Sequence, residues 1–186
     1  MKKNIAVFSS GRGGNFENIC DYFQNDNNIF IALHVTNRLN SISKKIADKR
    51  KIKNVYVTKG KLEKNSFHKV LQENNVHFIV LAGFLLKIPS SLVNLYEKKI
   101  INLHPSLLPR FGGKGMYGDN VHLAVLHSRD SKTGITIHYV NEEYDSGDII
   151  FQKEIKISTD EKLDTLREKI KAVEYYHFPR VIKSLL

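Results

Sequence analysis

Cysteine and long apolar runs are both scarce in this chain of 186 residues. Its one cysteine, Cys20, has no partner for an intramolecular disulfide bond, and a metal site built from several thiolates is excluded. The apolar segment Ile5–Phe8 is too short for the core of a signal peptide and too short to span a membrane. We therefore expect a cytoplasmic protein with no membrane partner.

A basic arm is also lacking, although the formal net charge is +10. The lysines are scattered along the sequence, and no aromatic residues that could stack on bases are interleaved with them. Nucleic acid is therefore not an expected partner. Two interpretations of the charge remain open: basic residues spread over solvated surfaces, or a positive field that attracts small anionic substrates.

No repeat, low-complexity tract or linker divides the chain, so one domain over residues 1–186 is expected. Apolar segments with the residues and lengths of β-strands alternate with amphipathic segments. Strands are predicted at Ile5–Phe8, Phe30–Thr36, Val55–Thr58, Phe78–Ala82, Ile100–Leu103, Gly134–Val140 and Ile149–Ile157. Helices are predicted at Asn15–Phe23, Ile42–Lys51, Phe67–Asn74 and Asp160–Leu185.

This alternation predicts an α/β fold, in which a mostly parallel twisted sheet carries helices on both faces. The later strands show no helical pattern between them, so we expect an antiparallel C-terminal portion. Ligands of such sheets bind beyond the carboxyl ends of the strands. The segments that follow the predicted strands are therefore the places to look for chemistry.

The segment Ser9–Phe16 follows the first predicted strand, is rich in glycine and leads into a helix. Glycine lets the backbone turn sharply and present N–H groups, and the helix N-terminus adds partial positive charge, so the segment suits a phosphate. Its spacing matches neither the dinucleotide fingerprint nor a Walker loop. An ordinary turn capped by Asn15 is the alternative.

Two further segments are candidates for lining a pocket. Leu81–Pro89 stays apolar well past the fourth predicted strand and could bind a flat heterocycle, although a helix start packed in the core is a competing interpretation. Phe111–Asp119 is dense in glycine and is expected to form a mobile loop close to the site.

Asn102 and His104 stand two positions apart in the fifth predicted strand, so their side chains should point the same way. Acyl transfer to an amine needs a donor for the carbonyl oxygen and a group that moves a proton to the leaving nitrogen. Asp145, in an acidic loop, could keep the imidazole charged. The alternatives are a structural histidine beside Pro105 and a plain hairpin loop.

A metal site and a serine hydrolase are both disfavoured. His122 and His127 have the wrong spacing for one helical face, and His138 is interpreted as a packed or hydrogen-bonded strand residue. The sequence contains no Gly-x-Ser-x-Gly elbow.

Four motifs now stand in order: Ser-Gly-x-Gly-Gly-Asn, Leu-Ala-Gly-Phe, Asn-Leu-His-Pro-Ser-Leu-Leu-Pro and Tyr-Asp-Ser-Gly. Over nearly its whole length the chain resembles the phosphoribosylglycinamide formyltransferase family of folate-dependent enzymes. The resemblance implies a single-domain, Rossmann-like formyltransferase fold, with a phosphate-binding half over residues 1–100 and a folate-binding and catalytic half over 101–186. It also implies formyl transfer from 10-formyltetrahydrofolate to the amine of 5'-phosphoribosylglycinamide in de novo purine (IMP) biosynthesis, by direct attack through a tetrahedral intermediate and without a metal.

The resemblance implies roles by position. Asn102 would hold the formyl oxygen, His104 would transfer protons and stabilise the oxyanion, and Asp145 would support His104 and organise a relay water. The acceptor would contact Gly11, Arg12, Gly13, Gly14, Asn15 and, at its ribose, Glu174. The folate would contact Lys64, Phe84, Leu85, Leu86, Lys87, Ile88, Val140, Asn141, Glu142 and Tyr144.

The chain departs from the family pattern at two places. Asn120 stands where many relatives carry the first histidine of His-x-His, and Tyr175 stands where relatives commonly have a histidine. Neither position belongs to the implied catalytic trio, so activity is expected, in a monomer or homodimer.

Methionyl-tRNA formyltransferases, formyltetrahydrofolate hydrolases and sugar-nucleotide formyltransferases are usually longer, so the length of this chain disfavours these three alternatives. A non-catalytic nucleic-acid-binding module would not need the trio.

Overall fold

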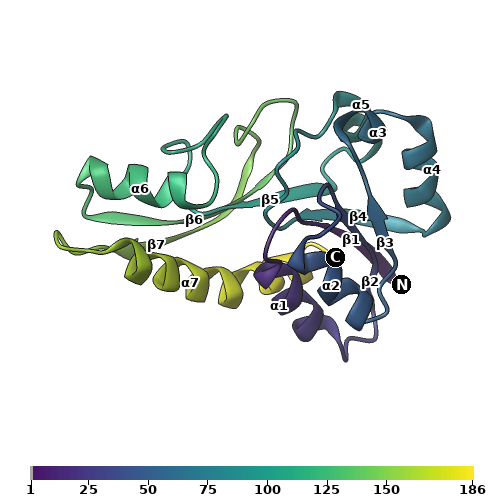
Figure 1. Cartoon of the computed structure of the whole chain (residues 1–186), viewed down its shortest axis with the longest axis horizontal. Coiled ribbons are helices and arrows are strands. Elements are labelled where there is room, and N and C mark those ends of the chain that lie inside the picture. Colours follow the sequence, from purple (N-terminus) through teal and green to yellow (C-terminus); the bar gives the residue numbers. More distant parts are fainter. Residues whose placement is uncertain (1) are drawn as a thin grey trace.

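The computed structural model describes residues 2–186 and contains one seven-stranded mixed sheet, ordered β3-β2-β1-β4-β5-β6-β7 (Figure 1). The pairs from β3 to β5 are parallel, whereas β6 pairs antiparallel with both β5 and β7. The strands are β1 (Lys3–Phe8), β2 (Ile29–Thr36), β3 (Asn54–Tyr56), β4 (Val76–Leu81), β5 (Ile100–His104), β6 (Lys132–Tyr139) and β7 (Ile149–Lys156).

Helices cover both faces of the sheet (Figure 1). They are α1 (Gly14–Phe23), α2 (Ile42–Lys49), α3 (Lys59–Leu62), α4 (Asn65–Glu73), α5 (Ser90–Leu95), α6 (Asp119–Ser128) and α7 (Leu163–Ser184). One hydrophobic cluster joins the sheet to α1, α2 and α7, and a second joins it to α3, α4 and α5. These layers confirm the predicted α/β architecture.

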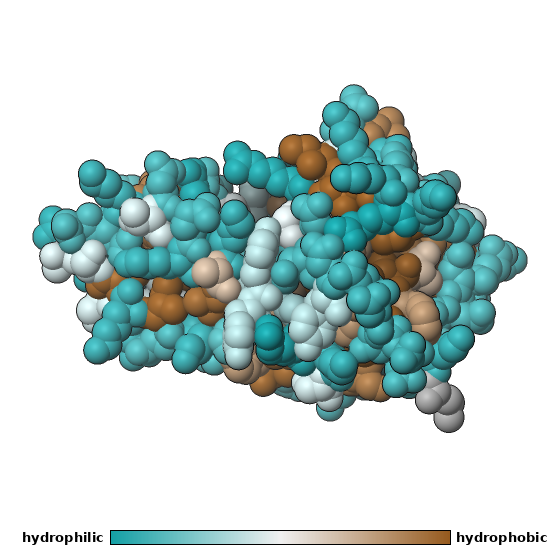
Figure 2. Space-filling model, turned by 90° about the horizontal axis from the view of Figure 1, so that it is seen from below, coloured by the Kyte–Doolittle hydropathy of each residue, from teal (hydrophilic) through white to brown (hydrophobic). Residues whose placement is uncertain are grey.

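The central strands are apolar on both sides because both faces of the sheet are covered. Successive side chains of a strand point to opposite faces. In β1, Ile5 and Val7 accordingly lie in the cluster under α1 and α7, while Ala6 and Phe8 lie in the cluster under α3, α4 and α5. The molecular surface on the face seen in Figure 2 is mostly hydrophilic.

The expectation that no helix separates the later strands is wrong for β5 and β6, because α6 lies between them in the chain. Val121 and Val125 of α6 are one turn apart and fully buried. The helix follows a glycine-dense segment and carries His122 and His127 among its apolar residues, so its helical pattern is weak in the sequence. The described segment 140–148 holds no helix, and the antiparallel C-terminal portion is confirmed.

The order of the strands determines where the connections after β1 and β4 lie. The chain runs from β1 outward to β2 and β3, and then returns to the other side of β1 to add β4 and β5. The connections that follow β1 and β4 therefore leave neighbouring strands in opposite directions, which opens a crevice at the carboxyl edge of the sheet.

Replacement of Phe67 by alanine is expected to lower the free energy of unfolding by about 3–5 kcal/mol, because the ring is lost from a closed core. Phe67 is fully buried and packs edge-on against Phe8, with 6.1 Å between the ring centroids. Phe30→Ala is the matched control, since that ring is 38% exposed, and should cost about 1 kcal/mol. Urea unfolding measures both, and equal losses would contradict the packing described.

Candidate active site

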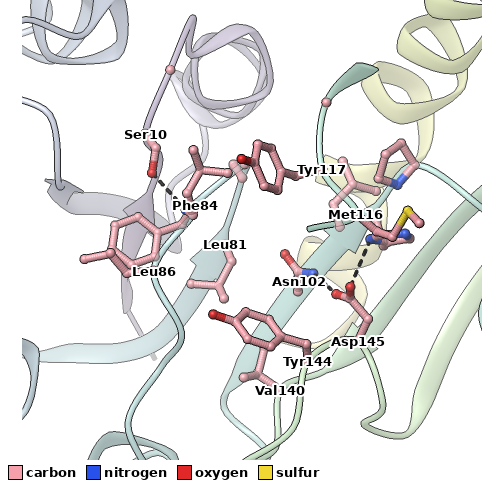
Figure 3. Close-up of a pocket in the computed structure, with 18 of the residues that line it drawn as sticks. Ser10, Leu81, Phe84, Leu86, Asn102, Met116, Tyr117, Val140, Tyr144 and Asp145 are labelled. Carbon is pink, nitrogen blue, oxygen red and sulfur yellow. Dashed lines mark hydrogen bonds and ion pairs between the residues drawn. The ribbon is translucent and has the colours of Figure 1, made fainter. Parts of the chain in front are cut away.

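A cleft of about 820 Å³ opens at this crevice (Figure 3). Its walls come from the segments after β1 and β4, from the ends of β5 and β6, from the glycine-dense segment 113–118 and from the loop after β6. In Figure 3, Phe84 and Leu86 lie on one side of the cleft, and Asn102 and Asp145 lie on the other. Residues far apart in the sequence therefore share one cavity.

Asn102, His104 and Asp145 meet in this cleft. The Asn102 and His104 side chains both line it from β5, as their spacing predicted. Asn102 Nδ2 donates to Asp145 Oδ1 over 3.3 Å, and His104 Nδ1 lies 3.5 Å from Asp145 Oδ2. The loop after β6 thus brings a carboxylate to both strand residues.

The two ring nitrogens of His104 face acceptors. Nε2 lies 2.8 Å from the carbonyl oxygen of Phe111, and Nδ1 faces the Asp145 carboxylate. Burial lowers the pKa of His104, although Asp145 and the Phe111 carbonyl oppose that effect. The imidazole is therefore held with partners that stabilise a proton it accepts, as a general acid–base group requires.

Asp145 is held as an anion by several donors. Burial by itself would raise its pKa, but the neighbouring His104 and the Gly113 N–H help to hold the pKa of Asp145 below its usual value. The Gly113 N–H donates to Oδ2 over 2.9 Å. This single carboxylate therefore connects β5, the loop after β6 and the glycine-dense segment.

His138 of β6 completes this arrangement. Its Nδ1 lies 2.8 Å from the Tyr139 carbonyl oxygen, which can only accept, so Nδ1 carries the proton. Nε2 is then the acceptor for Asn102 Nδ2, 3.1 Å away. The two hydrogens of the Asn102 amide are directed at His138 and Asp145, which fixes the orientation of that side chain. The expectation of a hydrogen-bonded strand histidine is confirmed.

The glycine-rich segment after β1 forms a tight loop that leads into α1. Gly13 has a φ of 76°, and a Cβ atom there would lie only 2.7 Å from the Cβ of Ser43, so both backbone geometry and the contact with α2 require glycine. The Ser43 N–H donates to the Gly11 carbonyl over 3.1 Å. The first turn of α1 leaves N–H groups without helical partners at this wall of the cleft, as an anion site needs.

Glu174 of α7 lies beside this loop. Its Oε2 accepts a hydrogen bond from Asn15 Nδ2 over 2.8 Å. Burial raises the pKa of Glu174 to about 7, and the Asn15 hydrogen bond opposes this only in part. The neutral carboxyl group therefore persists to higher pH than usual, and it can donate or accept a hydrogen bond to a hydroxyl group in the cleft.

The segment Leu81–Pro89 forms an apolar wall and not a helix start. Phe84 packs edge-on against Phe8, with 5.2 Å between the ring centroids. The Leu85 N–H donates to Ser10 Oγ over 2.9 Å, which ties this wall to the loop after β1 (Figure 3). Lys87 of the same segment reaches the loop after β6, where its Nζ lies 5.7 Å from the centre of the Tyr144 ring.

The structure brings nearly all the predicted site residues together. All six predicted acceptor contacts and the whole of 84–88 line the cleft, as do Val140, Asn141 and Tyr144. Lys64 lies exposed at the start of α4, and Glu142 is exposed in the loop after β6; neither lines the cleft.

Several lining residues were not predicted as site residues: Ser10, Arg38, Met116, Tyr117, His122 and His138. Ser10 and Tyr117 lie in the segments Ser9–Phe16 and Phe111–Asp119, which the sequence already indicates as parts of the site, so both could have been predicted. For His138, the sequence shows only that a polar residue stands in a buried strand, which is weak evidence for a site residue. Only the pairing of β5 with β6, in which Asn102 faces His138, shows why it belongs to the site.

The fold and the cleft define a doubly wound α/β protein with an anion loop and an amide–imidazole–carboxylate group at the carboxyl edge of its sheet. The model of the family described as formyl transferase matches residues 3–182, and the chain belongs to this family.

Named relatives support this assignment. Phosphoribosylglycinamide formyltransferase of Bacillus subtilis is 36% identical over 99% of this chain and 95% of its own length. The chloroplastic phosphoribosylglycinamide formyltransferase of Arabidopsis thaliana is also 36% identical over 99% of this chain, which spans only 65% of the plant protein. The crystal structure of glycinamide ribonucleotide transformylase 1 from Geobacillus kaustophilus matches with a TM-score of 0.90 and 33% identity over 100% of both chains.

Residues 2–186 offer neither a metal centre nor a membrane span. No cluster of three or more His, Cys, Asp or Glu side chains there could hold a metal ion. No helix in the same range is long and apolar enough to cross a membrane.

Glu174→Gln is expected to change how stability depends on pH. The carboxyl pKa is about 7 in the folded chain and about 4.5 in the unfolded one, so the folded state binds more protons between these values. The stabilising effect of the neutral carboxyl is complete below pH 4.5 and is lost as pH rises to about 7. The variant should therefore exceed wild type in unfolding free energy at pH 8, by up to about 3 kcal/mol.

Thermal or urea unfolding between pH 4.5 and 8 measures this difference. Glu97→Gln is the control, because Glu97 is exposed and should leave the profile unchanged. Parallel profiles for wild type and Glu174→Gln would contradict the elevated pKa.

Proposed function

We propose that the protein transfers the formyl group of 10-formyltetrahydrofolate to the amine of 5'-phosphoribosylglycinamide, in the purine biosynthesis of the cytoplasm. The observation that carries this proposal is the meeting of Asn102, His104 and Asp145 between a glycine-rich anion loop and an apolar wall. The relatives named above support the choice of substrates.

The loop after β1 and Glu174 would position the acceptor. Gly13, Gly14 and Asn15 line the cleft at the start of α1, where backbone N–H groups and the helix dipole would favour the phosphate dianion. Glu174, beside Asn15, would bind a ribose hydroxyl group. The amine at the far end of the acceptor would then point toward β5.

The apolar wall and the loop after β6 suit a folate. Phe84, Leu86 and Val140 offer apolar surface to a flat pterin, and the non-helical backbone of both segments offers N–H and carbonyl groups for its polar edge. 10-Formyltetrahydrofolate supplies the formyl carbon when bound there. The positive net charge of the chain attracts both substrates, since the acceptor carries phosphate and the donor carries carboxylates.

The catalytic side chains would act on charge and protons. Direct attack forms a bond between the acceptor nitrogen and the formyl carbon, and the formyl oxygen gains negative charge. Asn102 Nδ2 would donate to that oxygen by giving up its 3.3 Å contact with Asp145, the longer of its two hydrogen bonds. His104 would carry the proton lost by the amine toward the leaving nitrogen, whose bond to the formyl carbon breaks.

Asp145 would stabilise the protonated form of His104 through the 3.5 Å contact at Nδ1. Water bound to the carboxylate would complete the proton path. Direct attack forms no covalent bond to the enzyme. The cleft agrees with this, because its lining within residues 2–186 includes no cysteine, and Ser10 Oγ accepts a hydrogen bond from the Leu85 N–H.

His104→Ala is expected to lower kcat for acceptor-dependent formation of tetrahydrofolate by about 10²–10⁴-fold, since the proton-transfer group is removed. The assay follows absorbance with a formyl-folate donor, with and without phosphoribosylglycinamide. His127→Ala is the matched control, because this exposed histidine of α6 does not line the cleft and should leave kcat unchanged.

Three results would contradict the proposal. Equal turnover with and without the acceptor would indicate a hydrolase. Full activity in His104→Ala would remove the assigned role of the imidazole. Absence of turnover together with salt-sensitive binding of nucleic acid would favour a binding module instead.

A further inference from the structure

Another histidine, His34 of β2, lies outside the cleft in a buried polar group. Its Nε2 is 2.7 Å from Ser9 Oγ, and its Nδ1 is 2.6 Å from Asn54 Oδ1. Ser9 and His34 are both 0% exposed, and neither lines the cleft. Burying polar side chains costs free energy unless they are hydrogen-bonded, and apolar residues of similar size would fill the same space without that cost. A fully buried polar group such as this one therefore calls for an explanation.

The directions of the two hydrogen bonds follow from the chemistry of the partners. The Asn54 side-chain oxygen can only accept, so His34 Nδ1 carries the proton. Nε2 is then an acceptor, and the Ser9 hydroxyl donates to it. Burial lowers the pKa of His34, which keeps this neutral tautomer in place.

The order asparagine–histidine–serine resembles the arrangement that activates a nucleophilic hydroxyl group. Ser9 cannot act in that way here, because its hydroxyl is fully buried and no reactant in the cleft could reach it. The group therefore has a positioning role.

The ring of His34 touches both ends of the anion loop. Ser9 stands immediately before the loop, and Phe16, in the first turn of α1, stands immediately after it. The Phe16 and His34 rings are stacked, with 4.4 Å between their centroids and 27° between their planes. Asn54 in turn fixes the His34 ring from β3, the neighbouring strand.

We propose that His34 is a positioning residue that sets the separation of the two ends of the loop 10–15, and thereby the affinity of this loop for the phosphate of the acceptor. The identity of the anion rests on the proposed function. The contact with α2 fixes the middle of the loop through Gly11 and Gly13, whereas His34 fixes its ends.

The test separates binding of the two substrates. Ser9→Ala and His34→Leu should each raise the KM for phosphoribosylglycinamide about tenfold, as expected for the loss of one to two buried hydrogen bonds, with little change in kcat or in the KM for the folate donor. His34→Gln should retain most of the acceptor affinity that His34→Leu loses, because the glutamine side-chain oxygen can accept a hydrogen bond from Ser9.

A purely structural role predicts a different pattern. Leu71→Ala, a core change in α4 on the opposite face of the sheet, is the matched control for lost stability and should lower Tm without raising the KM for the acceptor. Unchanged acceptor KM in Ser9→Ala and His34→Leu would overturn the proposal. An equal rise in both KM values would overturn it too.

Two measurements are independent of the proposed function. Long-range ¹H–¹⁵N spectra of wild type should show the His34 ring protonated at Nδ1, and protonation at Nε2 would overturn the proposal. Titration of wild type and Ser9→Ala with inorganic phosphate, followed by the amide signals of residues 10–15, should show weaker binding in the variant. If wild type binds phosphate but does not turn over phosphoribosylglycinamide, the proposed function fails while this titration still decides the role of His34.

Discussion

The Asp145 carboxylate is the contact on which the arrangement of the cleft depends. Taking a charge out of water is costly unless hydrogen bonds compensate, and Asp145 obtains these from Asn102 and the Gly113 N–H, with His104 Nδ1 3.5 Å away. Each of these groups is held in place by the same carboxylate. Strand β5, the loop after β6 and the glycine-dense segment are thus joined by one buried anion, which also supplies the field that a proton on the imidazole requires.

The other half of the cleft is organised by close backbone packing. At Gly13 the loop after β1 approaches α2 so closely that no Cβ atom fits. His34 contacts the residues at the two ends of this loop, Ser9 and Phe16. Ser10 ties this loop to the apolar wall through the Leu85 N–H. An anion site made of backbone groups depends on such supports, because the N–H directions change with every shift of the chain.

Much of this site could be predicted from local patterns. The two-residue spacing of Asn102 and His104 gives both side chains a common direction on an extended strand. The glycine-rich segment before a helix indicated an anion loop, with an ordinary turn as the alternative. The segment Leu81–Pro89 was ambiguous, since an apolar stretch serves a pocket wall or a core helix equally well. Helix α6 was missed because it follows a glycine-dense segment and its apolar pattern is interrupted by histidines, whereas in the folded chain its Val121 and Val125 are fully buried.

The sequence by itself determined the alternation of strands and helices, the amide–imidazole pair and the glycine loop, because each depends on residues close together in the chain. Only the tertiary structure decided which distant residues meet: His138 against Asn102, Glu174 against Asn15, and His34 between Ser9 and Phe16. It also placed Lys64 and Glu142 away from the cleft. The physical reason is that strand order and burial, which set these contacts and the resulting pKa values, are properties of the whole packed sheet and leave no mark on any short segment.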